Sequence, residues 1–218
     1  MRIIKILIGI VTLFTLASCE KTEDINNTED KVGISRVTRF PVFNMEGETY
    51  VSIVKGGTFT DPGVTAKEGE TDLQVTITGS VDANTVGVYD LVYSATNKDG
   101  FSSTVTRTVA VLPSAEQAGV DISGSYSNVG AFTYTATIQK LAPGFYLADN
   151  IWGGGSAAII SAYIITTDGV NWVLPVSSLT GYGRVQGTGT IAPSGDVTYI
   201  VSLLDLGVNN STRKWKKV

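Results

Sequence analysis

From residue 36 onward, apolar and polar residues alternate along short runs, and clusters of glycine, asparagine and aspartate separate these runs. A period of two is typical of strands that bury one face. The clearest run is 87–95, where Tyr89, Leu91, Tyr93 and Ala95 fall on one side of the expected strand. No convincing helical period occurs downstream. The pattern therefore predicts an all-β protein.

The runs between residues 36 and 112 have the number and spacing expected of a small β-sandwich. Between two of them, Asn97-Lys98-Asp99-Gly100 predicts a hairpin turn, because asparagine, aspartate and glycine accept the backbone angles that tight turns need. The expected strands lie at 37–43, 48–54, 73–78, 87–95 and 104–111.

Several residues of this half occur in a characteristic order: Gly57, Phe59, Asp61-Pro62-Gly63 and Ala66, then Gly87-x-Tyr89-x-Leu91-x-Tyr93-x-Ala95, Asn97, Asp99-Gly100 and Arg107-x-Val109-x-Val111. In this order, residues 36–112 resemble the immunoglobulin-like (Ig-like) domain of bacterial surface proteins. The resemblance implies a sandwich that serves as a rigid spacer or an adhesive module and carries no catalytic motif.

Three aspartates, Asp61, Asp90 and Asp99, could converge on a calcium ion, which prefers several oxygen ligands. We favour the capping of turns instead, because Asp61 precedes Pro62 and Asp99 precedes Gly100. We therefore expect no metal site.

A short polar segment at 113–120 is expected to link the sandwich to a second domain at 121–218. About eight strands joined by tight turns predict an antiparallel meander there, which closes into a barrel or folds into a two-layer sandwich. The main strand signals lie at 132–139, 145–149, 157–167, 171–176, 184–191, 197–203 and 211–218.

The last expected strand carries Arg213, Lys214, Lys216 and Lys217 around Trp215. We interpret these cations as guards of an edge or an outer face against strand addition, with Trp215 turned inward. A basic binding patch is the alternative interpretation.

The N-terminus has a different pattern. Two basic residues precede an apolar run at 6–16, which is short for a membrane span and is typical of a secretory signal. The run closes with Leu16-Ala17-Ser18-Cys19, which resembles the lipobox of bacterial lipoproteins. The resemblance implies that residues 1–18 are removed and that the thiol of Cys19 carries lipid, a membrane anchor. The alternative is an ordinary signal peptide with an incidental cysteine.

Residues 19–35 are rich in acidic residues, Asn and Thr and hold few large apolar side chains, so we expect a flexible leash. Acidic residues directly after the cysteine also resemble the signal that sends some lipoproteins of Gram-negative bacteria to the outer face of the outer membrane. We therefore expect an outer membrane lipoprotein exposed at the cell surface. A plain polar spacer is the alternative.

Composition narrows the function. The chain has 16 Lys and Arg against 20 Asp and Glu, a net charge of -4, so we expect no nucleic-acid partner. It has no histidine, the usual general base and the commonest metal ligand, so we expect no enzyme activity and no cofactor. The acidic residues of 121–218 include Asp168 and Asp196 in turn sequences, which also disfavours a glycoside hydrolase with paired carboxylates.

A second resemblance covers the C-terminal half. Gly124-Ser125-Tyr126, the run 145–149 leading into Gly153-Gly154-Gly155, and the closing strand around Trp215 follow one another in this order. This order resembles the C-terminal domain of surface lipoproteins that often accompany glycan uptake systems. The resemblance implies carbohydrate capture.

One loop has the parts of a carbohydrate site. A sugar can stack its C–H face on an exposed aromatic ring such as Trp152, while Asp149 and Asn150 bind its hydroxyls. Trp172 and Tyr182 could supply further platforms. The alternative for Trp152 is that it folds over the open end of the barrel and seals the core.

Two classes of function stay open. We expect a non-catalytic surface lipoprotein that binds glycan or assists glycan uptake. The alternative is an adhesin or a structural scaffold subunit that holds a protein partner. In either class, the expected partners of the protein are the membrane, through Cys19, and a polysaccharide or a surface protein.

Overall fold

The computed structural model describes residues 31–32, 35–130, 133–156 and 158–218. The predicted signal peptide, Cys19 and most of the predicted leash lie outside the described residues. Contacts divide the chain into two compact units, of which the first ends at Arg39 and the second runs from Phe40 to Val218. In the first unit, β1 (Lys31–Val32) and β2 (Ser35–Arg36) pair as antiparallel strands.

The described chain is all-β, as predicted, apart from the 3-10 turn η1 (Leu204–Leu206). A search of the described residues finds no helix that is both long enough and apolar enough to cross a membrane.

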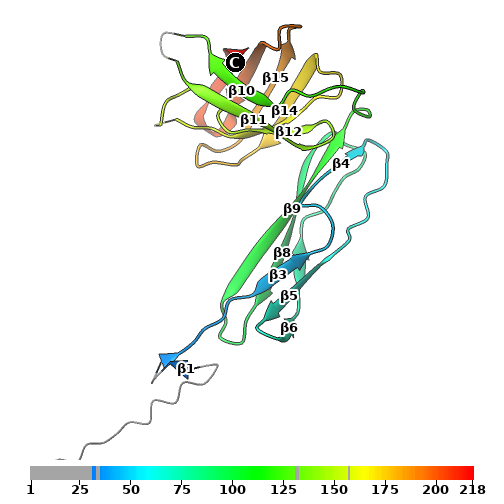
Figure 1. Cartoon of the computed structure of the whole chain (residues 1–218), viewed down its shortest axis with the longest axis vertical. Coiled ribbons are helices and arrows are strands. Elements are labelled where there is room, and N and C mark those ends of the chain that lie inside the picture. Colours follow the sequence, from blue (N-terminus) through cyan, green and yellow to red (C-terminus); the bar gives the residue numbers. More distant parts are fainter. Residues whose placement is uncertain (1–30, 33–34, 131–132, 157) are drawn as a thin grey trace, which may run out of the picture. The chain divides into compact units, whose positions relative to one another are not determined.

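The N-terminal half of the second unit is the predicted sandwich of two sheets (Figure 1). One sheet has the order β3-β5-β6 and consists of β3 (Val42–Met45), β5 (Val64–Glu68) and β6 (Thr71–Leu73). The other has the order β4-β9-β8-β7 and consists of β4 (Tyr50–Val54), β9 (Ser102–Leu112), β8 (Gly87–Thr96) and β7 (Thr76–Thr78). Every pairing is antiparallel except that of β4 with β9, which is parallel.

Two strand predictions in this half are wrong. The strand expected at 37–43 begins only at Val42, directly after Pro41, which has no N–H to give to a neighbouring strand. The strand expected at 73–78 is divided, because Leu73 ends β6 and Thr76 begins β7 in the other sheet. The chain crosses between the sheets within one apparently continuous run.

The β8–β9 hairpin turns where the sequence predicts, and the side chain of Asn97 holds the turn. Asn97 is 5% exposed, and its Oδ1 accepts hydrogen bonds from the backbone N–H groups of Asp99 (3.1 Å) and Phe101 (2.7 Å). The side-chain oxygen of Asn97 therefore accepts the hydrogen bonds that a backbone carbonyl accepts in a regular turn.

The aspartates considered for calcium have separate roles. Asp61 Oδ1 accepts a hydrogen bond from the backbone N–H of Gly63 (3.0 Å), which is the predicted turn contact. Asp90 lies within β8 instead of a turn, and its Oδ1 accepts from Thr108 Oγ1 (2.7 Å). Within the described ranges, no group of three or more acidic, cysteine or histidine side chains could hold a metal ion.

The core of the sandwich contains a charge that the sequence analysis did not anticipate. The side chain of Arg107 on β9 is completely buried. Its guanidinium pairs with Asp61 and donates hydrogen bonds to the carbonyl oxygens of Glu46 and, over 3.1 Å, Glu48. The Tyr93 hydroxyl donates to Asp61 Oδ2 (2.7 Å), and burial together with this bond raises the pKa of Tyr93 to about 12. One carboxylate thus joins a turn to β8 and β9.

Replacing Arg107 with methionine leaves Asp61 without its partner. We expect Arg107→Met to lower the free energy of unfolding by about 3–5 kcal/mol, the usual cost of removing one member of a buried ion pair. Chemical denaturation followed by circular dichroism measures this loss.

Arg184→Met is the matched control, because Arg184 and Asp205 form an ion pair at the surface, with Nη2 and Oδ1 2.6 Å apart. Solvent screens an exposed ion pair, so we expect this variant to unfold almost like the wild type. Equal losses in the two variants would contradict the structural role of Arg107.

The C-terminal half is a closed barrel of eight antiparallel strands, which decides between the two predicted architectures. Each strand pairs with the next along the chain, and pairing of the last with the first closes the barrel. The strands are β10 (Gly124–Asn128), β11 (Thr135–Ala142), β12 (Phe145–Ala148), β13 (Ala162–Ile165), β14 (Asn171–Ser177), β15 (Val185–Ile191), β16 (Val197–Leu203) and β17 (Val208–Lys217).

Closure overturns the edge part of the interpretation of the last strand. β17 pairs with β16 on one side, and Trp215–Lys217 pair with β10 on the other, so Lys216 and Lys217 have no free edge to protect. Lys214 and Lys216 are exposed on the outer face, the other part of that interpretation. Trp215 is 3% exposed and lies in the core, as predicted.

The strands expected at 132–139 and 157–167 begin later, at Thr135 and Ala162. Ile160 lies in the apolar run that predicted the earlier start, but it is in a loop and packs into the core from there.

Small and large side chains on neighbouring strands fill the barrel interior. Trp172 on β14 lies in register with Gly189 on β15, which faces Tyr199 on β16. A Cβ atom on Gly189 would overlap Trp172 Nε1 and Tyr199 Cβ. The two rings meet edge to face, with centroids 5.0 Å apart and an interplanar angle of 88°. Glycine at 189 therefore makes the room in which both rings pack.

Strand β13 is buried on both faces, which explains its uninterrupted apolar sequence. Ala162 and Ile164 belong to the barrel core. Tyr163 and Ile165 belong to a second cluster, which includes Leu112 at the end of β9. The end of the sandwich and the outside of the barrel thus share an apolar contact.

Polar contacts hold the segment between β9 and β10. Glu116 Oε1 accepts hydrogen bonds from Gly144 N and the Tyr146 hydroxyl, both over 2.9 Å, and Oε2 accepts from Lys140 Nζ, also over 2.9 Å. The Glu116 side chain is only 14% exposed. The segment expected to be a linker is therefore fastened to the barrel at its centre.

The contacts of Glu116 make its charge part of the folded structure. Burial by itself would raise the pKa of Glu116, but the hydrogen bonds from Lys140, Gly144 and Tyr146 outweigh burial and lower that pKa below its ordinary value. A carboxyl with a lowered folded pKa adds stability above its unfolded pKa of about 4.3, and this stability is lost as pH falls through the folded value.

We expect Glu116→Gln to lower the free energy of unfolding at neutral pH by about 1–3 kcal/mol, the cost of hydrogen bonds lost to a charged group. The difference from wild type should shrink below about pH 4, as the wild-type carboxylate also becomes neutral. Urea denaturation at a series of pH values measures it. Glu70→Gln is the control, because Glu70 is exposed. A difference that stays constant with pH would contradict the role of the charge.

Candidate functional site

Four loops lie at one end of the barrel, because successive strands run antiparallel. Their described residues are 129–130 with 133–134, 149–156 with 158–161, 178–184 and 204–207, and we call this end the loop end. The loop 149–161 is the longest and contains three of the predicted ligand-binding residues, Asp149, Asn150 and Trp152. Tyr182 lies on a neighbouring loop at the same end. The topology therefore gathers four of the five predicted residues at one end of the barrel.

Asn150 shapes the glycine-rich turn and is turned away from solvent. It is 7% exposed, its Oδ1 accepts a hydrogen bond from Gly153 N (3.1 Å), and its Nδ2 donates to Gly154 O (3.3 Å). These contacts use the amide atoms that the sequence analysis assigned to a sugar hydroxyl.

Asp149 keeps part of its carboxylate available. The residue is exposed, and its Oδ1 accepts a hydrogen bond from Thr137 N (2.7 Å) on β11. In the described chain, its Oδ2 forms no hydrogen bond. This oxygen can therefore accept a bond from a ligand hydroxyl.

Residues 149–156 and 158–161 of this loop lie across the barrel end, and we call them the lid. Ile151 and Ile160 are buried in the core, 2% and 1% exposed. Inside the barrel, the Tyr199 hydroxyl donates to the carbonyl of Ile151 and accepts from Trp215 Nε1 (2.7 Å). Gly153 has φ +70°, and a Cβ there would lie 3.2 Å from Trp215 Cζ2. The two isoleucines seal the barrel, and the glycine lets the loop approach β17.

Trp152 lies on this lid, partly buried, and packs against the barrel core. The ring therefore takes part in sealing the barrel, the alternative considered from the sequence. The guanidinium of Arg213 covers its face, with Cζ 3.8 Å from the ring centroid, a cation–π contact. Part of the Trp152 side chain stays accessible to solvent.

Arg213 is the candidate that the edge interpretation missed. It is in register with Tyr199 on β16 and lies on the same face of β17 as the buried Trp215, which is the inward face. Burial lowers the pKa of Arg213. The signal was available in the sequence, because residues two apart on a strand point the same way and Trp215 was expected to point inward.

The expectation for Trp172 is wrong. Its ring is 3% exposed and packs in the barrel core, so it offers no face to a sugar. Its neighbour Asn171 is the exposed one, and its Nδ2 donates to Asp168 Oδ2 in the preceding turn (2.8 Å). The turn before the strand suggested exposure, but the alternation along β14 decides which of the two residues faces solvent.

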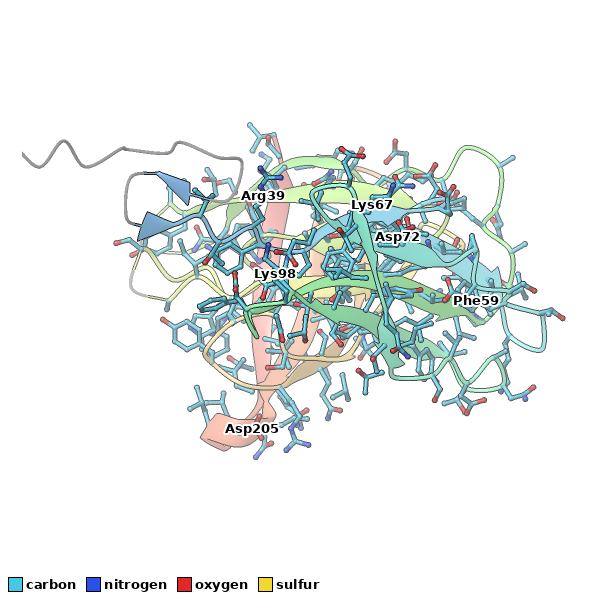
Figure 2. All side chains as sticks on the ribbon, turned by 90° about the horizontal axis from the view of Figure 1, so that it is seen from below. Arg39, Phe59, Lys67, Asp72, Lys98 and Asp205 are labelled. Carbon is cyan, nitrogen blue, oxygen red and sulfur yellow. The ribbon has the colours of Figure 1, made fainter. Side chains whose placement is uncertain are left out.

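Tyr182 is partly buried and packs against the barrel core. Its loop is tied to the neighbouring loop by Arg184, whose backbone N–H donates to Asp205 Oδ2 (2.7 Å) and whose Nη2 donates to Oδ1 (2.6 Å). Figure 2 shows Asp205 at the turn between β16 and β17. The hydrogen bond from the Arg184 side chain lowers the pKa of Asp205.

Comparison with known proteins identifies part of the chain. Residues 43–111 match the family described as bacterial surface protein, Ig-like domain. No curated protein matches the sequence. Among solved structures, a lipoprotein from Bacteroides thetaiotaomicron is similar, with 26% identity over 82% of this chain and 100% of that chain and a TM-score of 0.40.

Two structures of Clostridium perfringens ZmpB are also similar, and this chain spans less than half of each. One contains the M60 catalytic domain with the CBM51-1 and CBM51-2 domains; it shares 13% identity over 84% of this chain and 23% of that chain, with a TM-score of 0.32. The other contains CBM51-2 in complex with GlcNAc and INT domains; it shares 15% identity over 81% of this chain and 47% of that chain, with a TM-score of 0.30.

Proposed function

We propose that this chain, whose residues 43–111 form an Ig-like domain of the bacterial surface protein family, is a non-catalytic surface lipoprotein that binds glycan at the loop end of its barrel. We further propose that Cys19 anchors it to the outer membrane and that the Ig-like sandwich holds the barrel out as a spacer.

The observation that carries the proposal is the composition of the loop end. A partly exposed indole, Trp152, and an exposed carboxylate, Asp149, lie on the loop that contains the glycine-rich turn, and an inward cation, Arg213, lies over the indole. Carbohydrate sites combine an aromatic surface for the C–H face of a sugar with a few polar groups for its hydroxyls. Glycines let the backbone approach such a ligand closely.

The carboxylates of the barrel favour a binding role over catalysis. A glycosidase needs a general acid with a raised pKa, beside a second carboxylate. Here hydrogen bonds lower the pKa values of Asp121, Asp168 and Asp205, and Asp196 Oδ1 accepts from the backbone N–H of Lys217 (3.0 Å). These carboxylates stabilise local structure.

Truncating the indole tests the binding site. We expect Trp152→Ala to weaken binding of the best polysaccharide in affinity gel electrophoresis by about tenfold or more, the effect typical of losing a central aromatic contact. Trp152→Phe should keep part of the affinity, because a smaller ring still stacks.

Phe101→Ala is the control, since Phe101 is an exposed aromatic residue of the sandwich, 48% exposed. Thermal unfolding of each variant verifies that the barrel is intact. If no polysaccharide in a broad panel retards the wild type, or if Trp152→Ala migrates like the wild type, the proposed site is wrong.

The lipid anchor is tested separately. We expect the wild type to take up labelled fatty acid and to fractionate with the outer membrane, because two or more acyl chains bind a bilayer almost irreversibly. Cys19→Ala should abolish both properties, while Thr22→Ala, three residues further on, should keep them. Membrane retention of the Cys19 variant would contradict lipidation.

One observation favours the second candidate, a scaffold or adhesin that holds a protein partner. Phe40 and Phe101 are 56% and 48% exposed on the sandwich, and their ring centroids lie 5.5 Å apart. Exposed aromatic groups of this kind mark protein contacts. Loss of a protein partner on Phe101→Ala, with binding kept in Trp152→Ala, would favour this candidate.

A further inference from the structure

The three arginines whose contacts are described above differ in whether a carboxylate neutralises the charge of the guanidinium. Arg107 is paired with Asp61 and donates to two carbonyl oxygens, and Arg184 is paired with Asp205. Arg213 has no carboxylate within ion-pair distance anywhere in the described part of the chain. It is an inward-facing cation at a barrel end without an anion beside it.

The hydrogen-bonding groups of Arg213 are also poorly used. Its Nη1 donates to the carbonyl oxygen of Thr212 (3.1 Å), which is its one hydrogen bond among the described residues. Its Nε is buried without a partner. A buried donor with no acceptor costs free energy, more when the group is charged, so such an atom calls for an explanation.

Trp152 holds this cation in place. The indole ring lies 3.8 Å from Cζ of Arg213 and belongs to the lid that Tyr199 fastens through the carbonyl of Ile151. A guanidinium over an aromatic ring keeps its charge and its remaining N–H donors, which point outward in the plane of the group. Its Nη2 forms no hydrogen bond and is not among the buried unpartnered atoms, so solvent reaches it.

We infer that the ligand of the loop end carries a carboxylate, as uronic acids do, and that Arg213 binds this carboxylate. The inference rests on the proposed glycan-binding function and names the class of glycan. The accessible Nη2 of the guanidinium can donate a charge-assisted hydrogen bond to a carboxylate, and a bound carboxylate supplies the anion that the protein does not. Asp149, exposed on the same lid, accepts sugar hydroxyls.

The negative net charge of the chain opposes binding of an acidic polysaccharide. At -4, the surface as a whole repels polyanions. Binding of an acidic polysaccharide therefore needs a local cation, and Lys214, which is exposed on the outer face of β17, is the neighbouring cation that points away from the barrel interior.

The test compares two polymers with the same backbone: polygalacturonate and its fully methyl-esterified form, in which each carboxylate is capped. Alginate and hyaluronate extend the acidic set, and dextran and galactan extend the neutral set. We expect the wild-type protein to bind at least one acidic polymer, and to bind polygalacturonate over its ester by about tenfold or more if that polymer is the ligand. Arg213→Met should remove the preference for the acidic polymer, and Lys214→Met should keep it.

The outcomes separate the two proposals. If the wild type binds a neutral polymer as well as an acidic one and Arg213→Met changes neither, the carboxylate inference is overturned and the glycan function stands. If no polymer binds, the glycan function itself fails. If dextran sulfate binds better than every uronate and loses its binding in Arg213→Met, the site takes a sulfate, and the carboxylate assignment is overturned.

A stability measurement distinguishes a ligand-binding arginine from a structural one. Since Arg213 is partly desolvated and lacks an anionic partner, we expect Arg213→Met to unfold at the same temperature as the wild type or at a higher one. A clear drop in the unfolding temperature, with binding unchanged, would show that Arg213 serves the fold.

Discussion

The barrel depends on the fit of two aromatic rings over one glycine. Trp172 and Tyr199 can meet edge to face inside a ring of eight strands because Gly189 has no side chain between them. Their position determines what lies above. The Tyr199 hydroxyl binds the carbonyl of Ile151, which draws the long loop across the barrel end. The packing of Tyr199 inside the barrel therefore determines the position of the lid and of Trp152.

The two halves of the second unit are joined by an apolar contact and a polar one. Leu112 at the end of β9 packs with the outward side chains of β13, and a few residues later Glu116 is held by three donors on the barrel. The two contacts bracket the segment that enters the barrel. Specific side chains on both sides therefore contact this segment.

Local patterns in the sequence predict much of this fold. The strands predicted at 87–95, 104–111 and 197–203 and the turn at Asn97 follow from alternation and turn chemistry, and the structure has them within two residues at each end. Long-range pairing does not, because alternation is the same for a strand with one neighbour and a strand with two. The edge role given to β17, the parallel pairing of β4 with β9 and the ion pair of Arg107 with Asp61 all depend on partners far along the chain.

The candidate site follows the same division. Position along the chain correctly placed Asn150, Trp152 and Tyr182 on loops, and it put Asp149 at the end of a strand that stops one residue earlier. Exposure could not be deduced, because it depends on what covers each residue. Asn150 is covered by its own turn, and Trp172 is buried in the barrel core. Arg213 was not predicted as a site residue, because the cations of the last strand were interpreted together. The alternation of side chains along a strand would have placed Arg213 on the inward face with Trp215.

The parallel pairing of β4 with β9 has a mechanical consequence. The chain enters the sandwich sheet through β4 and leaves it through β9, and five residue pairs, from Tyr50 with Thr108 to Val54 with Leu112, join the two strands. Tension applied between the N-terminal side and the barrel pulls parallel neighbours in opposite directions along their length. Their hydrogen bonds are then loaded in shear and share the force. They do not break one after another from one end, as they do when a hairpin is unzipped.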